Sequence, residues 1–322
     1  MAWIMRATTL LLSLLALLAW ASPSSSQTTQ DWITGAPREA MPIKAWPGGK
    51  KVAVCFVLYV EVWGRGHGPV FRPDKVGTNP DVLNESFRQY AIHWGVPRVG
   101  RLFKEQDVPI TIALNAQFPG QHPETWKTFR ASVPKAPILG HGMNNSTEEL
   151  PLDKGLEAQK AYIKRVLDLI EKDTGARPRG WSSPSVTPNV DTFAATVGEG
   201  IRYSLDGMDS EVLSRLMTPA GPLVLIPYPT QTVDMGQYLG RQKEPVDFER
   251  QWIDYVDELA READGDTDRP ATVVAIGVHP FVMGTPSGAA AFRRVLEALK
   301  EQPLVWLTDT DAVMAAAGVK QP

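Results

Sequence analysis

Residues 51–59, KVAVCFVLY, form a near-continuous run of apolar β-forming side chains, a pattern typical of a strand covered on both faces. Similar short apolar runs recur along the chain, and stretches with a helical period lie between them. The clearest helical period spans residues 154–174 and ends at Gly175. Because strands alternate with helices throughout, the sequence predicts an α/β fold with a parallel sheet and crossover helices.

The expected elements follow one another without a break in composition. Strands are predicted at 51–59, 108–114, 201–205, 223–226, 272–278 and 304–307, with another ending at 138–139, and helices at 94–106, from His122, and at 154–174, 189–197, 245–263, 287–300 and 309–317. A chain of 322 residues could form two average domains, but an α/β barrel reaches roughly 250 residues as one unit. We therefore predict a single barrel over residues 48–318.

The N-terminal residues have the parts of a secretory signal. Arg6 supplies a positive charge, residues 8–18 are apolar, and residues 19–21, Ala-Trp-Ala, offer a cleavage site. The apolar run is shorter than the ~20 residues that a membrane-spanning helix needs. We expect residues 1–21 to be removed and the protein to be secreted or periplasmic, with no integral membrane span; an uncleaved anchor is the alternative. Residues 22–47 are expected to be a linker and lead-in with little packing.

Composition narrows the class of partner. The net charge of -3 gives no electrostatic reason to expect nucleic acid or an anionic membrane surface. Cys55 is the only cysteine, so the chain has no internal disulfide and no CxxC pair for zinc. Nucleic acid and an anionic membrane surface are therefore not the expected partners.

Residues 138–147, ILGHGMNNST, change abruptly from an apolar run to close-spaced polar groups. In α/β barrels this change, at the carboxyl end of a strand, marks the edge where the chemistry takes place. His141 could therefore be a general base, a metal ligand or a hydrogen-bond anchor. The alternative is an ordinary strand-to-loop turn.

Other predicted strand ends carry polar or aromatic side chains that would meet on the same face of a barrel. We predict catalytic roles for Glu61, His141, Asp206 and His279, because a buried charge is costly without a task. The alternatives are a salt bridge from Glu61 to a rim arginine, a hydrogen bond from His279 to a carbonyl, and a turn cap at Asp206.

Substrate-binding residues are expected beside these groups. Candidates that could hydrogen-bond a substrate or stack on a sugar are Asn144, Asn145, Ser183, Trp63, Trp181 and Tyr228. Large aromatic side chains are more often part of the core, which is the alternative for the last three.

Several segments at these strand ends resemble motifs of a known family. The segments are GHGMNNS (140–146), TGARPRGWSSP (174–184), IRYSLD (201–206), IGVHPFVMGTP (276–286) and YAIHWGVPR (90–98). Together they resemble the NodB-homology polysaccharide deacetylase superfamily, and within it the metal-free, allantoinase-like branch. The resemblance implies a distorted (β/α)7 barrel that hydrolyses a C–N bond, usually in an N-acetyl group on an amino sugar.

In usual members of this superfamily one Asp and two His hold a divalent metal, an Asp is the base, and the fifth-motif His, here His279, is the acid. This chain departs from that pattern. Only Glu61 stands where the first motif has paired Asp, and Asn144 or Asn145 stands where the second metal-binding His is expected. Asn is a poor ligand for transition metals compared with imidazole.

Three outcomes remain open. Glu61, His141 and His279 could form a substitute site for zinc or another divalent metal. The enzyme could instead work without metal, with Glu61 or His141 as base and Asn144, Asn145 or backbone N–H groups stabilising the oxyanion. Thirdly, the barrel could have lost catalysis and only bind glycan. We expect a hydrolase of a linear amide bond, acting as an amino-sugar N-deacetylase; an allantoinase-like ureide or amide hydrolase and a non-catalytic glycan-binding protein are the alternatives.

Overall fold

The computed structural model describes residues 28–31, 33–76, 80–146, 150–266 and 268–319. The predicted signal segment, residues 1–21, lies outside the described residues. Within the described ranges, no helix combines the length and the apolar character needed to cross a membrane.

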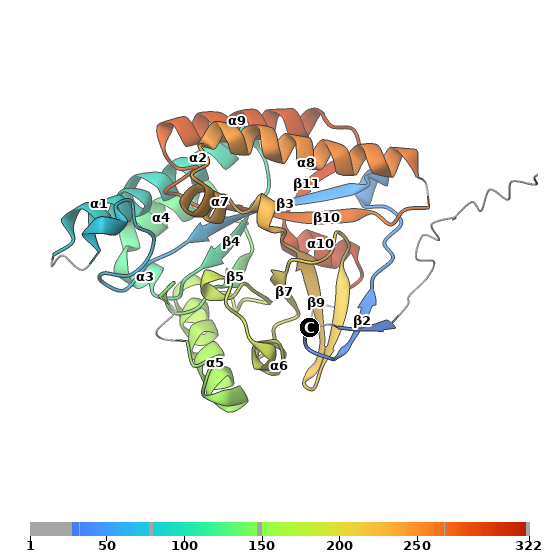
Figure 1. Ribbon diagram of the computed structural model, residues 1–322, viewed down its shortest axis with the longest axis horizontal. Helices are drawn as coiled ribbons and strands as arrows, with labels where there is room; N and C mark the ends of the chain where they lie inside the picture. Colours follow the sequence, from blue (N-terminus) through green and yellow to red (C-terminus); the bar gives the residue numbers. More distant parts are fainter. Residues whose placement is uncertain (1–27, 32, 77–79, 147–149, 267, 320–322) are drawn as a thin grey trace, which may run out of the picture.

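A curved sheet of parallel strands forms the centre of the molecule (Figure 1). Its parallel strands, in spatial order, are β10 (Thr272–Val278), β3 (Val52–Val60), β4 (Thr111–Leu114), β5 (Ile138–Gly140), β6 (Gly180–Trp181), β7 (Tyr203–Gly207) and β9 (Gly221–Pro227). The short strand β11 (Val305–Thr308) also pairs in parallel with the first half of β3. The prediction of an α/β fold with a parallel sheet is confirmed.

The two ends of this sheet approach each other. Strands β9 and β10 are in contact, and a bridge between Val233 and Gly277 lies at their seam. No ladder of hydrogen bonds joins β9 to β10 among the residues that the structure describes. The strands thus form a barrel with an open seam, in keeping with the distorted barrel that was expected.

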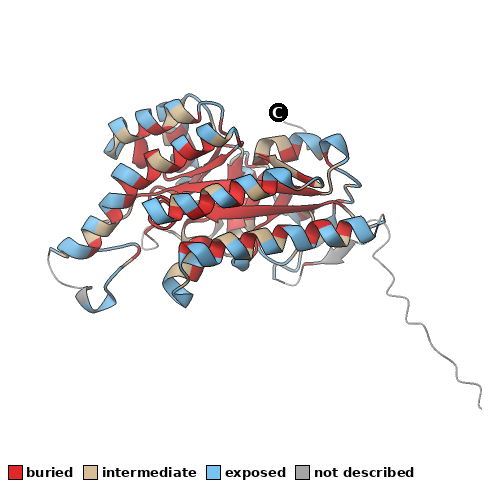
Figure 2. Cartoon of the chain, turned by 90° about the horizontal axis from the view of Figure 1, so that it is seen from above, coloured by how far each residue is buried: buried red, intermediate tan, exposed pale blue. Residues whose placement is uncertain are grey.

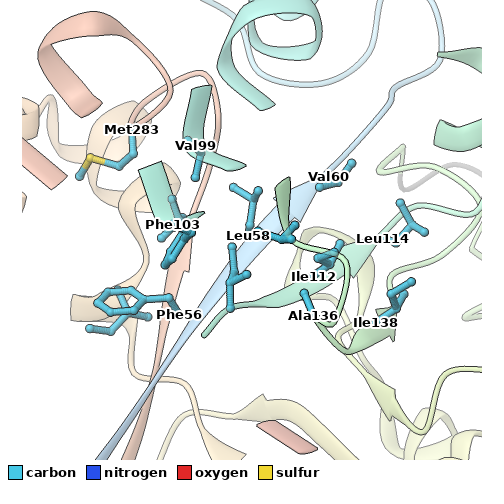
Figure 3. Close-up of a cluster of buried hydrophobic side chains, with 14 of the residues drawn as sticks. Phe56, Leu58, Val60, Val99, Phe103, Ile112, Leu114, Ala136, Ile138 and Met283 are labelled. Carbon is cyan, nitrogen blue, oxygen red and sulfur yellow. The ribbon is translucent and has the colours of Figure 1, made fainter. Parts of the chain in front are cut away.

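Alternate side chains of β3 face opposite sides of the sheet, as the strand period requires. Ala53, Cys55, Val57 and Tyr59 belong to an inner cluster inside the barrel. Val52, Val54, Phe56, Leu58 and Val60 belong to the outer layer under the helices. Figure 3 shows part of this outer layer, where β3 side chains pack near Val99 and Phe103. All nine residues of β3 are buried, and this burial on both faces explains why the sequence of the strand is continuously apolar.

Helices cover the outside of the barrel, each with a buried and an exposed side (Figure 2). The longer helices are α1 (Val82–Tyr90), α2 (Val96–Gln106), α4 (Pro123–Ser132), α5 (Gly155–Thr174), α6 (Val190–Gly198), α8 (Pro245–Gly265) and α9 (Pro286–Glu301). The short helices are α3 (Phe118–Gln121), α7 (Asp234–Arg241) and α10 (Thr310–Ala316), and a π-helical turn spans Ala91–Gly95. Val313 and Met314 of α10 pack into the inner cluster, so this helix fills one end of the barrel.

The N-terminal segment differs from the expected linker with little packing. Strands β1 (Thr28–Gln30) and β2 (Pro37–Ala40) form an antiparallel hairpin, and β2 pairs with β8 (Ser214–Thr218) at the sheet edge. Trp46 is buried and its indole N–H donates to the Thr272 carbonyl at 2.7 Å. The Ser, Thr and Pro content suggested a linker, but pairing with a distant strand decided the structure of this segment.

Candidate active site

Polar side chains follow directly after most of the parallel strands. These residues are Glu61 after β3, Asn115 after β4, His141 after β5, Ser182 after β6, Tyr228 after β9 and His279 after β10, and all are buried. Because the strands are parallel, their carboxyl ends lie at the same edge of the barrel. The sequence-predicted catalytic residues are therefore brought to one end of the fold.

The two carboxylate oxygens of Glu61 have different surroundings. Oε1 accepts a hydrogen bond from Asn145 Nδ2 at 2.6 Å and lies 3.1 Å from His141 Nε2. Oε2 is buried and has no hydrogen-bond partner among the described residues. A buried carboxylate oxygen without a partner is costly, so Oε1 is anchored while Oε2 is left without a hydrogen bond at a cost in free energy.

Both ring nitrogens of His141 are engaged. Nδ1 lies 2.7 Å from the Ser182 carbonyl oxygen, which can only accept, so Nδ1 carries a hydrogen. Nε2 faces Glu61 and lies 3.1 Å from its Oε1. Asn115 joins the two strand ends, since its Oδ1 accepts from the Val62 N–H at 3.0 Å and its Nδ2 donates to the His141 carbonyl.

His279 forms a second pair with a residue that the sequence did not single out. Its Nδ1 lies 2.5 Å from Asp234 Oδ1, and its backbone N–H donates to Asp234 Oδ2 at 2.8 Å. Burial opposes protonation of His279, but the charge and hydrogen bond of Asp234 outweigh it, so the pKa of the imidazole is raised. Asp234 fixes the orientation of the ring and leaves Nε2 without a hydrogen bond in the described structure.

Tyr59 lies between the two imidazoles. Its ring stacks on His279 at a centroid distance of 4.5 Å and an interplanar angle of 2°, and it meets the edge of His141 at 4.9 Å. Its hydroxyl lies 3.2 Å from Ser182 Oγ. Burial raises the pKa of the phenol, so Tyr59 stays neutral. Glu61, His141 and His279 thus form one cluster around this ring, which we call the Glu–His cluster.

Of the two candidate asparagines, Asn145 faces Glu61. The Asn145 Oδ1 accepts from the Ser185 N–H at 2.8 Å, which orients the amide N–H groups toward the carboxylate. Ser185 and Val186 both have a φ of 51°. A positive φ is uncommon for any residue other than glycine and is rarest for a β-branched residue such as Val186. Such strained backbone often lies at functional sites. Asn144 turns away, since its Nδ2 donates to Gln117 Oε1 at 3.3 Å.

Asp206 and Ser183 lie beside the cluster as a hydrogen-bonded pair. Asp206 accepts from the Ser183 N–H at 2.9 Å and from Ser183 Oγ at 2.8 Å. Burial raises the pKa of the Asp206 carboxyl, and the Ser183 hydrogen bonds and the His141 ring counteract this only in part. Asp206 therefore lies close enough to His141 of the Glu–His cluster for the two side chains to interact electrostatically.

The three candidate aromatic residues do not share one surface. Trp181 is buried beside Gly140 and Leu167, on the helix side of the sheet. Tyr228 is buried in the inner cluster, and a Cβ at Gly277 would lie only 2.1 Å from its hydroxyl. Both rings are almost fully buried, as in a protein core. Trp63 is partly exposed, with its ring 6.4 Å from Phe281.

The cluster does not fit a divalent metal. No three His, Cys, Asp or Glu side chains in the described ranges form a group that could hold a metal ion. His141 has no ring nitrogen left for a metal, because both nitrogens lie within hydrogen-bond distance of other groups. The N–H of Asn145 donates to Glu61 Oε1, so that carboxylate oxygen already has a hydrogen-bond donor where a metal would bind. The described side chains therefore do not form the metal site of Glu61, His141 and His279 that was one of the three outcomes left open.

Comparisons with known proteins identify the fold. No family model matches the sequence, and no curated protein matches it significantly. Puue allantoinase is similar in structure, with a TM-score of 0.74 and 24% identity over 87% of this chain and 95% of that chain.

Two further solved structures are similar to this chain over most of its length. A probable polysaccharide deacetylase from Pseudomonas aeruginosa PAO1 has a TM-score of 0.72 and 23% identity, over 87% of this chain and 95% of that chain. A polysaccharide deacetylase homologue from Mycobacterium smegmatis has a TM-score of 0.70 and 22% identity, over 88% of this chain and 96% of that chain. These similarities confirm the fold that the predicted resemblance implied.

Proposed function

We propose that the protein is a hydrolase of linear C–N bonds and that its substrate is the amide of an N-acetylated amino sugar. The observation that carries this proposal is the buried, unpartnered Oε2 of Glu61 within a cluster that contains two imidazoles. Such an oxygen, at the carboxyl edge of a barrel, is placed to accept a proton. The deacetylase and allantoinase names of proteins with the same fold agree with this class of reaction.

Glu61 is the general base in this mechanism. Asn145 and His141 hold Oε1, so Oε2 alone is free to take a proton from a water molecule. The water oxygen then bonds to the amide carbon, and the carbonyl oxygen becomes an oxyanion. The amide of Asn145, which lies beside Glu61, is the group that we assign to stabilise that oxyanion.

His279 is the general acid. Because Asp234 holds Nδ1, a protonated His279 presents its Nε2–H to the leaving nitrogen. The C–N bond breaks as this nitrogen takes the proton, giving a carboxylic acid and an amine. Exchange of one proton with solvent returns Glu61 to the carboxylate and His279 to the imidazolium. One water molecule is consumed in each turnover.

Treatment with a chelator is expected to leave activity within about twofold of the untreated protein, since the residues of the cluster do not fit a metal. The measurement is the rate of amide hydrolysis after dialysis against EDTA, together with the metal content of the protein. A loss of activity that zinc restores would contradict the assignment of Glu61 as a base that acts without metal.

A ureide is a second candidate substrate, because Puue allantoinase shares the fold. Parallel assays of acetate release from N-acetylated glycans and of ring opening of allantoin distinguish the two substrates. The amino-sugar amide is favoured when only the first assay responds.

We also propose that the protein is exported. Expression of the full chain in a bacterial host is expected to give a secreted or periplasmic protein that begins after Ala21. N-terminal sequencing of the exported fraction tests this expectation, and a cytoplasmic protein that retains residues 1–21 would contradict it.

A further inference from the structure

Tyr59 contacts the Glu–His cluster but has no part in the hydrolysis proposed above. Its side chain is buried, and it projects from β3 into the inner cluster two residues before Glu61. Its ring lies parallel to the His279 ring, with a centroid distance of 4.5 Å and an interplanar angle of 2°. The His141 ring lies edge-on at a centroid distance of 4.9 Å. A single tyrosine therefore contacts both histidines of the cluster.

Neighbouring side chains hold the Tyr59 ring in place. Its hydroxyl lies 3.2 Å from Ser182 Oγ, and the carbonyl oxygen of Ser182 lies 2.7 Å from His141 Nδ1. The Tyr228 ring lies at a centroid distance of 6.1 Å and an interplanar angle of 29°. Tyr228 is itself packed closely against β10, since a Cβ at Gly277 would lie 2.1 Å from its hydroxyl oxygen. Because close packing locks the rotamer of a buried side chain, the Tyr59 ring is a rigid surface for the imidazoles.

His279 is a buried imidazole, and its protonated form needs support from its surroundings. Burial opposes protonation, but the negative charges of Asp234 and Glu61 favour it, so the pKa of the imidazole is raised. Burial also raises the pKa of the Tyr59 and Tyr228 hydroxyls, so both phenols are neutral. A cation within about 6 Å of the centroid of an aromatic ring, over its face, is attracted by the ring quadrupole. The face of Tyr59, at 4.5 Å, therefore also favours the imidazolium.

We propose that Tyr59 is a positioning residue for the acid of the hydrolase, because its ring fixes the tilt of the His279 imidazole and supports the imidazolium. The role of His279 as acid rests on the proposed function, whereas the stacking of the two rings does not depend on hydrolysis. The Asp234 carboxylate holds Nδ1 of His279, and the face of Tyr59 restrains the tilt of the imidazole. Together these contacts fix the direction of Nε2, the nitrogen that gives its proton to the leaving group.

The test is an NMR titration of the His279 imidazole in the full-length folded protein, which needs no turnover. In the wild type, the ring current of Tyr59 is expected to shift the C–H protons of His279 upfield, because the two rings are stacked. Tyr59→Leu should remove this shift and lower the pH at which His279 loses its proton, since leucine has no aromatic face. Tyr59→Phe keeps the face and should restore both properties.

Tyr203→Leu is the matched control. Tyr203 is an equally buried tyrosine of the inner cluster, but its hydroxyl contacts Thr310 and Asp311. This variant should leave the titration of His279 unchanged. In assays of amide hydrolysis, Tyr59→Leu should lower kcat by about 10²-fold with little change in KM, as expected when a reacting group is misplaced. Tyr59→Phe should recover most of that loss.

A wild-type His279 without the upfield shift would overturn the proposal, and so would a His279 titration that is the same in Tyr59→Leu as in Tyr203→Leu. The melting temperature of each variant identifies any that fails to fold, and in that case the spectra of the wild type and of Tyr59→Phe decide the outcome. Acetate release by the wild type tests the hydrolysis separately. A His279 titration that depends on Tyr59, without any amide hydrolysis, removes the proposed function and leaves Tyr59 as the residue that orients His279.

Discussion

Glu61→Gln is expected to lower kcat/KM for amide hydrolysis by about 10³-fold, within the range of 10²–10⁴ that a positioned acid or base contributes. Glutamine keeps the size of the side chain, and its amide oxygen can still accept from Asn145. It cannot take a proton from water, because an amide is not basic. The measurement is the rate of acetate release from N-acetylated glucosamine oligomers at saturating and at limiting substrate.

The matched control for this change is Glu301→Gln, at the exposed end of α9. This variant should retain the wild-type rate, since it removes the same charge far from the cluster. A Glu61→Gln variant that hydrolyses the substrate as fast as Glu301→Gln would remove Glu61 from the mechanism. Circular dichroism of both variants checks that they are folded.

Asp234→Asn is expected to lower kcat/KM by about 10²–10⁴-fold, by analogy with the loss seen when a histidine loses the carboxylate that sets its tautomer. Asp234 raises the pKa of His279, so the protonated form is favoured in the folded protein. The alkaline limb of the pH–rate profile should therefore lie above the reference histidine pKa of about 6.5 in the wild type and move to lower pH in the variant.

The same pair predicts how stability changes with pH. Because the folded-state pKa of His279 is raised, protonation of this group stabilises the fold fully below the unfolded-state pKa. That contribution is lost as the pH rises through the folded-state value, and Asp234→Asn should abolish it. Asp191→Asn, in the first turn of α6, controls for the general effect of removing a carboxylate from the start of a helix. Identical melting temperatures across the pH range for Asp234→Asn and the wild type would contradict the stabilising role of the Asp234–His279 pair.

Much of the site could be predicted because strands leave a strong local signal. Glu61, His141 and His279 each follow an apolar run, and each apolar run is a parallel strand in the structure. Since parallel strands end at one edge, residues more than two hundred positions apart could be expected to meet. The convergence of these three side chains is thus a consequence of topology.

Other parts of the site leave no comparable signal. Asp234 begins an eight-residue helix whose pattern is interrupted by Gly236 and Gly240, and it meets His279 across 45 residues of chain. Tyr59 lies within an apolar run, where an aromatic side chain is expected to be ordinary core. The side of the sheet that Trp181 faces depends on strand register, because a shift of one residue moves a side chain to the other face. Such features depend on tertiary contacts that a single sequence does not reveal.

The most direct test of the proposed function compares acetate release from N-acetylated glucosamine oligomers by the wild-type protein and by the double variant Glu61→Ala/His141→Ala. Both proteins must be folded at the assay temperature, as judged by their melting temperatures. If the Glu–His cluster is the catalytic centre, the wild type releases acetate and the double variant does not exceed the uncatalysed rate. Equal rates of release from the two proteins would contradict a catalytic role for the cluster.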